Sequence, residues 1–64
     1  MPQWTVNPRD AGVRLDKFLA SPARVGSRGR AAEALERGKI FVNDREASLA
    51  QAGTRLAAGD VVRA

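Results

Sequence analysis

The chain has 64 residues, which is enough for one domain with a small hydrophobic core. It contains no cysteine and no histidine, so disulfides, Ser-His or Cys-His triads and the usual zinc sites are excluded, and neither a metal nor a cofactor is expected. Eleven Lys and Arg residues, nine of them Arg, against seven Asp and Glu residues give a formal net charge of +4, which favours a polyanionic partner over a merely soluble basic surface.

Residues 1–11 predict a short strand followed by a lead-in segment. Residues 3–6 alternate apolar and polar side chains, and Asn7-Pro8 ends the alternation. Trp4, the single tryptophan, is expected to cover the core. The N-terminus has no charged lead, and no apolar run of the chain approaches roughly 20 residues. We therefore expect no signal peptide, no membrane span and a cytoplasmic location.

Residues 13–38 predict a unit of two packed helices, of which the first spans residues 13–20. Apolar side chains recur at helical spacing there, at Leu15, Phe18 and Leu19. A Ser-Pro pair then ends the helix, because proline cannot continue it. The loop over residues 22–26 carries Arg24, which is expected to be exposed.

The second helix, within residues 27–39, carries the strongest indication of function. Ser27 is a suitable N-cap, and Gly38 stands where a left-handed residue ends a helix. Arg28 and Arg30 lie in the first turn, where the helix dipole is already positive and acidic residues are usual. A helix start with unpaired N–H groups and two guanidinium groups suits an anion, which we interpret as RNA phosphate.

Residues 39–64 predict a small sheet. The clearest strand is residues 39–43, and Asn43-Asp44 is a turn signal. Weaker strands are expected over residues 45–48 and 54–56, separated by a loop, and a last strand over residues 61–63. Two short packed helices against a small, mainly antiparallel, curved sheet make an α+β domain.

Four groups of residues, taken in order, resemble a known family. They are Arg14-Leu15-Asp16-Lys17-Phe18-Leu19; Ser27-Arg28 with Ala31 and Leu35; Gly38-Lys39-Ile40-Phe41-Val42-Asn43; and Leu56 with Gly59-Asp60-Val61-Val62. Together they resemble the RNA-binding domain named after ribosomal protein S-four, also called the αL motif. The segment WTVNPRDAG before RLDKFLA is similar to the form of this domain at the N-terminus of large-subunit ribosomal RNA pseudouridine synthases.

The resemblance implies an RNA-binding surface on the helices and the following strand. Carried over by motif, Arg14 and Lys17 of the first helix would face RNA. Ser27, Arg28 and Arg30 at the start of the second helix would do so as well, and so would Lys39 and Asn43 at the strand. Arg37 is a further candidate, but an ion pair with Glu33 at i,i+4 explains it equally well.

The predicted function is that of a monomeric module that grips structured, ribosomal RNA through phosphate contacts. The resemblance implies the substrate-binding head of a pseudouridine synthase-like protein; the alternative is a stand-alone RNA- or ribosome-associated protein with no attached enzyme. No catalytic residue is expected within the 64 residues, because the carboxylates are scattered and no nucleophile-base pair is visible. A DNA-binding module and a protein-interaction or membrane-surface module remain as rival hypotheses.

Overall fold

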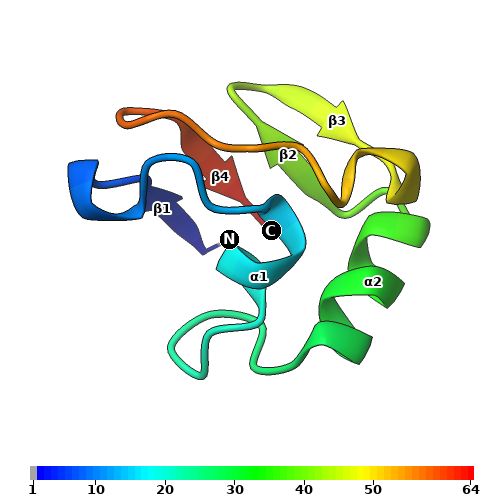
Figure 1. Cartoon of the computed structure of the whole chain (residues 1–64). Helices are drawn as coiled ribbons and strands as arrows, with labels where there is room; N and C mark the ends of the chain where they lie inside the picture. Colours follow the sequence, from blue (N-terminus) through cyan, green and yellow to red (C-terminus); the bar gives the residue numbers. More distant parts are fainter. Residues whose placement is uncertain (1) are drawn as a thin grey trace.

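The computed structural model describes residues 2–64 and has an α+β architecture, with two short helices packed on one face of a four-stranded antiparallel sheet (Figure 1). In chain order the elements are β1 (Gln3–Thr5), the 3-10 turn η1 (Pro8–Asp10), α1 (Leu15–Leu19), α2 (Arg28–Glu36), β2 (Ile40–Val42), β3 (Arg45–Ala47), the 3-10 turn η2 (Leu49–Gln51) and β4 (Val61–Arg63). The predicted α+β class is confirmed. Neither α1 nor α2 has the length or the apolar stretch that crossing a bilayer requires.

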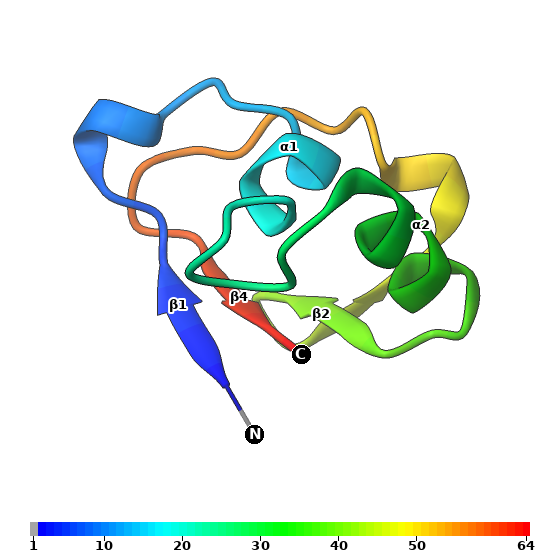
Figure 2. The same ribbon diagram turned by 90° about the horizontal axis from the view of Figure 1, so that it is seen from below.

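The sheet has the order β1-β4-β2-β3, and every neighbouring pair is antiparallel. Trp4 of β1 and Val42 of β2 both lie opposite Val62 of the central strand β4. The first and last strands are therefore neighbours, and the two ends of the chain lie on the same side of the molecule. Figure 2 shows α1 and α2 in front of the sheet, so the helices form one layer and the strands the other.

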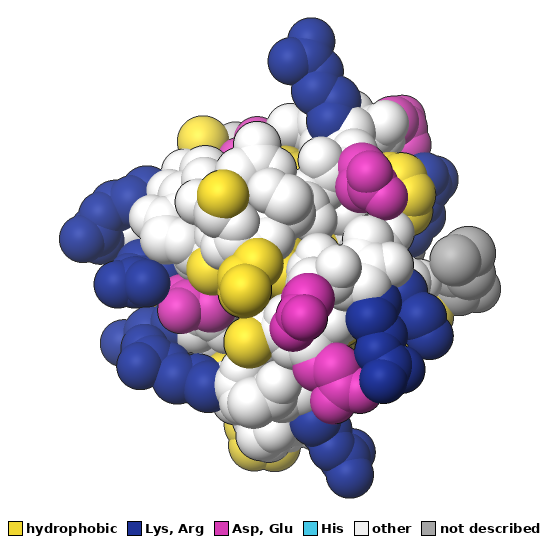
Figure 3. Space-filling model, turned by 90° about the vertical axis from the view of Figure 1, so that its right-hand side faces the viewer, with side chains coloured by type: hydrophobic (Ala, Val, Ile, Leu, Met, Phe, Trp, Pro, Cys, Tyr) yellow, Lys and Arg dark blue, Asp and Glu magenta, His cyan; other side chains and the backbone are white. Residues whose placement is uncertain are grey.

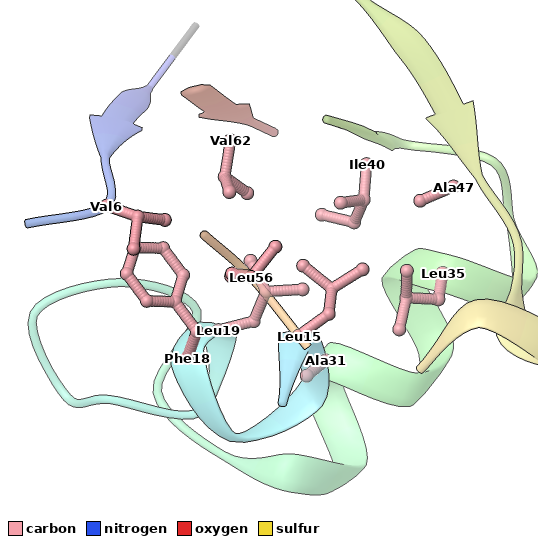
Figure 4. Close-up of a cluster of buried hydrophobic side chains, with 10 residues drawn as sticks. All are labelled: Val6, Leu15, Phe18, Leu19, Ala31, Leu35, Ile40, Ala47, Leu56 and Val62. Atoms are coloured by element: carbon pink, nitrogen blue, oxygen red, sulfur yellow. The ribbon is translucent and has the colours of Figure 1, made fainter. Parts of the chain in front are cut away.

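The core lies between these two layers (Figure 4). Its largest fully buried side chains come from both layers, with leucines on the helices and Val6, Ile40 and Val62 on the strand side. The ten buried hydrophobic residues are Val6, Leu15, Phe18, Leu19, Ala31, Leu35, Ile40, Ala47, Leu56 and Val62. Trp4 is half-buried and packs against this cluster, as expected.

Helix α2 has the predicted start and end. The Ser27 hydroxyl accepts a hydrogen bond from the Arg30 N–H at 3.1 Å, which satisfies one of the free donors of the first turn. Gly38 has φ +71°, the left-handed conformation that glycine adopts most easily. The carboxylate of Glu46 lies where a Cβ on residue 38 would stand, but this exposed side chain can move aside, so the positive φ is the main reason for glycine here.

Helix α1 is shorter than the predicted range of residues 13–20. The preceding backbone does not turn into the helix because it pairs with a later segment: Leu56 N–H donates to Val13 O and Leu15 N–H to Thr54 O, each at 2.9 Å. The strand expected over residues 54–56 is wrong. These residues do pair with residues 12–15, but the pairing amounts to one isolated bridge, between Arg14 and Arg55, and is too short to form a strand.

Arg24 is not the exposed loop residue that was expected. Its guanidinium lies 3.7 Å from the centre of the Phe18 ring and donates a hydrogen bond to the Phe18 carbonyl oxygen at 3.0 Å. The side chain thereby covers one edge of the small core with its aliphatic part and a cation–π contact. Sequence pattern could not indicate this contact, because it depends on how the loop folds back over α1.

The β2–β3 hairpin turns at Asn43 and Asp44, which have φ values of +51° and +66°. Two consecutive left-handed residues make the tight turn whose twist matches the flanking strands. Asn43 also ties the turn to β4: its Oδ1 accepts the Val61 N–H at 2.9 Å and its Nδ2 donates to Asp60 at 3.1 Å. Within residues 2–64, the Asp44 side chain makes one exposed ion pair, with Arg63 at 3.1 Å, and no other side-chain bond.

Glycine substitutions at the two turn positions should therefore have opposite effects. Asp44→Gly places glycine, which adopts a positive φ without strain, at a left-handed position, and it loses only an exposed ion pair. We therefore expect the free energy of unfolding to stay the same or to rise by up to about 1 kcal/mol. Asn43→Gly removes two hydrogen bonds and should lower it by about 1–2 kcal/mol. Urea unfolding of both variants measures the difference, and equal effects would contradict the assigned role of Asn43.

Candidate functional site

Five basic side chains surround one hollow of about 550 Å³, which we call the basic hollow. They come from four separate parts of the chain: the turn η1, the segment before α1 with α1 itself, the first residue of α2, and the segment that precedes the last strand. These residues are Arg9, Arg14, Lys17, Arg28 and Arg55. Asp10 is the one carboxylate among the lining residues that the structure describes.

Backbone pairing brings the distant members of this set together. Residues 12–15 run antiparallel to residues 54–56, so that Arg14 and Arg55 form a bridge. The Arg55 guanidinium also donates to the Gly12 carbonyl oxygen at 2.9 Å, which holds its side chain across the hollow's wall. Packing of α1 against α2 then places Lys17 and Arg28 around the same hollow.

The charge in the basic hollow is largely unbalanced. Arg14 pairs with Asp16, with 3.2 Å between Nε and Oδ1. Within residues 2–64, the other four basic side chains of the hollow make no ion pair. Figure 3 shows several Lys and Arg side chains along the left-hand edge of the view, with others at its top, right and bottom. Cations placed close together repel one another, so this arrangement favours a bound anion.

Three predicted site residues lie elsewhere, around a smaller hollow of about 260 Å³ on another side of α2. They are Arg30, Arg37 and Lys39, and Glu33 lies between them. Arg37 pairs with Glu33, with 2.9 Å between Nη2 and Oε1, so the expected i,i+4 ion pair is confirmed. The predicted RNA-contacting residues therefore divide into two surfaces, of which this one is partly neutralised.

Ser27 and Asn43, also predicted to contact RNA, both make hydrogen bonds inside the protein. The Ser27 hydroxyl caps α2, and it remains exposed at the helix start near Arg28. The Asn43 side chain joins the hairpin to residues 60 and 61 with both its oxygen and its nitrogen. Asn43 does not line the basic hollow, and the geometry gives it a role in the fold.

Arg9 and Arg55 were missed as site residues by the sequence interpretation. Neither lies on a helix of the S-four-like pattern, and the chain places them 46 positions apart. The only signal in the sequence is their contribution to the basic excess, which says nothing about position. Arg55 joins the site through the pairing of residues 12–15 with residues 54–56, and Arg9 lines it from the turn η1.

No metal centre accompanies these residues in the part of the chain that the structure describes. Among residues 2–64, no three acidic side chains come close enough together to hold a metal ion. The chemistry that the site offers is therefore that of guanidinium, ammonium and backbone N–H donors, which bind anions.

The Asp60 carboxyl makes the hairpin contact dependent on pH. Hydrogen bonds from the Ala57 N–H at 2.8 Å and from the Asn43 amide at 3.1 Å lower its pKa below the ordinary value. A carboxyl whose pKa is lower in the folded chain stabilises the fold above its unfolded-state pKa, and this contribution disappears as the pH falls through the folded-state pKa.

We therefore expect Asp60→Asn to lower stability at neutral pH and to flatten its decline below about pH 5. The free energy of unfolding, measured by urea titration at a series of pH values, checks both effects. The same slope against pH in the native chain and in the variant would contradict the role of Asp60.

Comparison of this sequence with models of known protein families and with curated proteins found no match. The likeness to the S-four-type domain therefore depends on the motif residues themselves.

Proposed function

We propose that this chain is a binding module that holds structured RNA by its phosphates, with the basic hollow as the main contact surface. One observation carries the proposal: five basic side chains from separate segments converge on one hollow, and four of them have no ion pair within residues 2–64. Arginine suits this role because its planar guanidinium can bind two phosphate oxygens at once.

Stability alone gives no reason for this arrangement. Arg28 is the first residue of α2, where the helix dipole disfavours a cation by about 0.3–1 kcal/mol. Lys17 and Arg55 bring further positive charge to the same hollow. A bound polyanion removes the repulsion, and the free N–H groups at the start of α2 add donors to its phosphate oxygens.

The choice of RNA over DNA comes from the resemblance to the S-four-type domain, since phosphate contacts alone do not separate the two. A hollow lined by cations recognises the spacing and shape of phosphates, which is how proteins bind most folded RNA. In the wider proposal, the module is monomeric and is the substrate-binding head of a pseudouridine synthase-like protein that acts on ribosomal RNA in the cytoplasm. A stand-alone RNA- or ribosome-associated protein is the alternative.

The proposal predicts a strong dependence of affinity on salt. About four phosphate contacts give a slope of roughly −3 to −4 for log affinity against log salt. Affinity for a fluorescent RNA hairpin should then fall about a hundredfold between 50 and 200 mM KCl, as measured by anisotropy. A slope near zero would contradict binding through phosphates. If duplex DNA competes more strongly than the RNA hairpin, the ligand of the module is DNA and not RNA.

Two charge-matched variants test where the RNA lies. Arg28→Gln removes a cation without an ion pair from the basic hollow, so affinity should fall about fivefold and the salt slope by about 1. Arg37→Gln removes the same charge from the same helix, but at a residue that Glu33 already neutralises. We expect little effect from this control.

Thermal unfolding of both variants verifies that they fold. Equal losses of affinity in the two variants would mean that binding follows net charge, and not the geometry of the basic hollow.

A further inference from the structure

A third hollow, of about 500 Å³, lies between the β2–β3 hairpin and the turn η2, and we call it the hairpin hollow. Its apolar wall consists of Leu15, Val42 and Ala47, all of which belong to the core cluster or pack against it. Its polar lining includes Arg45, Gln51 and Thr54, together with Asn43 and Glu46. An apolar wall with a few convergent polar groups is the usual construction of a small-ligand pocket of this size.

Two of the polar side chains that line the hairpin hollow, Gln51 and Thr54, are exposed and have unused donors. Gln51 is held in place because its Oε1 accepts the Ser48 N–H at 2.9 Å, and its amide nitrogen makes no hydrogen bond within residues 2–64. In the same range the Thr54 hydroxyl makes none. Side chains with unused donors can form hydrogen bonds to the acceptor atoms of a ligand.

Arg45 adds an unpaired cation to this hollow. It lies directly opposite Val42 in the hairpin, so it is on the helix-facing side of the edge strand β3. It makes no ion pair within the described part of the chain. A cation in this position can guard a sheet edge against aggregation, but here it also lines a cavity with free donors and an apolar wall.

The basic hollow and the hairpin hollow are lined in part by the same two segments of the chain. These segments are residues 12–15 and residues 54–56, which pair with each other. Arg14 and Arg55 line the basic hollow, whereas their chain neighbours Leu15 and Thr54 line the hairpin hollow. The two hollows are therefore lined by consecutive residues of the same two paired segments.

We propose that the hairpin hollow receives one unpaired nucleotide of an RNA whose backbone lies in the basic hollow; this inference rests on the proposed function. The flat face of the base packs against Val42, the partly exposed apolar residue of the lining. Its acceptor atoms receive hydrogen bonds from Gln51 and Thr54, and Arg45 lies against the phosphate of the same nucleotide. Readout of an unpaired base in a pocket is how proteins read sequence in folded RNA.

The test compares two RNA hairpins that differ only in one bulged nucleotide, which is either intact or abasic. Both carry the same number of phosphates, so binding to the basic hollow is the same for both. The native protein should bind the intact bulge about tenfold more tightly, the value of one or two buried hydrogen bonds. Anisotropy measures both affinities, and their ratio is the readout.

Two variants then remove the donors without removing the fold. Gln51→Glu keeps the oxygen that accepts the Ser48 N–H but loses the amide donors, and Thr54→Val keeps the shape but loses the hydroxyl. Each should bring the ratio towards one. The matched control is Gln3→Glu on strand β1, which introduces the same charge away from the hairpin hollow and should keep the tenfold ratio.

The outcomes separate this inference from the proposed function. A tenfold ratio that is lost in the two variants and kept in Gln3→Glu supports it. If the native protein binds both RNAs equally and with the expected salt slope, the hairpin hollow holds no base and only this inference fails. The inference also fails if the ratio survives in both variants. If the protein binds neither RNA, the proposed function fails and this inference fails with it.

Discussion

Three main-chain hydrogen bonds between residues 12–15 and residues 54–56 fix the relative positions of two segments that line both the basic hollow and the hairpin hollow. They delay the start of α1 to Leu15, and they bring Arg55 beside Arg14. The core holds the paired segments in place, because Leu15 and Leu56, one on each segment, are both buried in it. Burial of these two leucines thus fixes the position of charged neighbours that are themselves exposed.

The distribution of charge follows from the same division between core and surface. Ten small and medium-sized hydrophobic residues fill the space between helices and sheet, which leaves the surface free to carry a net positive charge. On one side of α2 the cations alternate with an acid, as in the Arg37–Glu33 pair. On the other side they converge with little compensation around the basic hollow. This asymmetry, more than the total of +4, is what an RNA phosphate backbone would recognise.

Several structural features were predictable from the sequence because each depends on residues close together in the chain. The cap at Ser27, the left-handed Gly38, the turn at Asn43-Asp44 and the Arg37–Glu33 pair all involve partners at most four positions apart. Local sterics and hydrogen bonding decide such features. Apolar spacing likewise indicated the two helices and the strands at residues 40–42 and 61–63. The α+β class follows from these elements.

Only the tertiary structure decided which cations share a surface. Arg28 and Arg30 are two positions apart in sequence, yet they line different hollows, because the two sides of a helix face different neighbours. Arg9 and Arg55 are far apart in sequence and line the same one. Arg24 contacts Phe18 because the loop that carries it folds back over α1, which is also a tertiary arrangement. Sequence by itself determined the local elements and the excess of positive charge, whereas long-range backbone pairing decided where that charge converges, since no local pattern encodes contacts between distant segments.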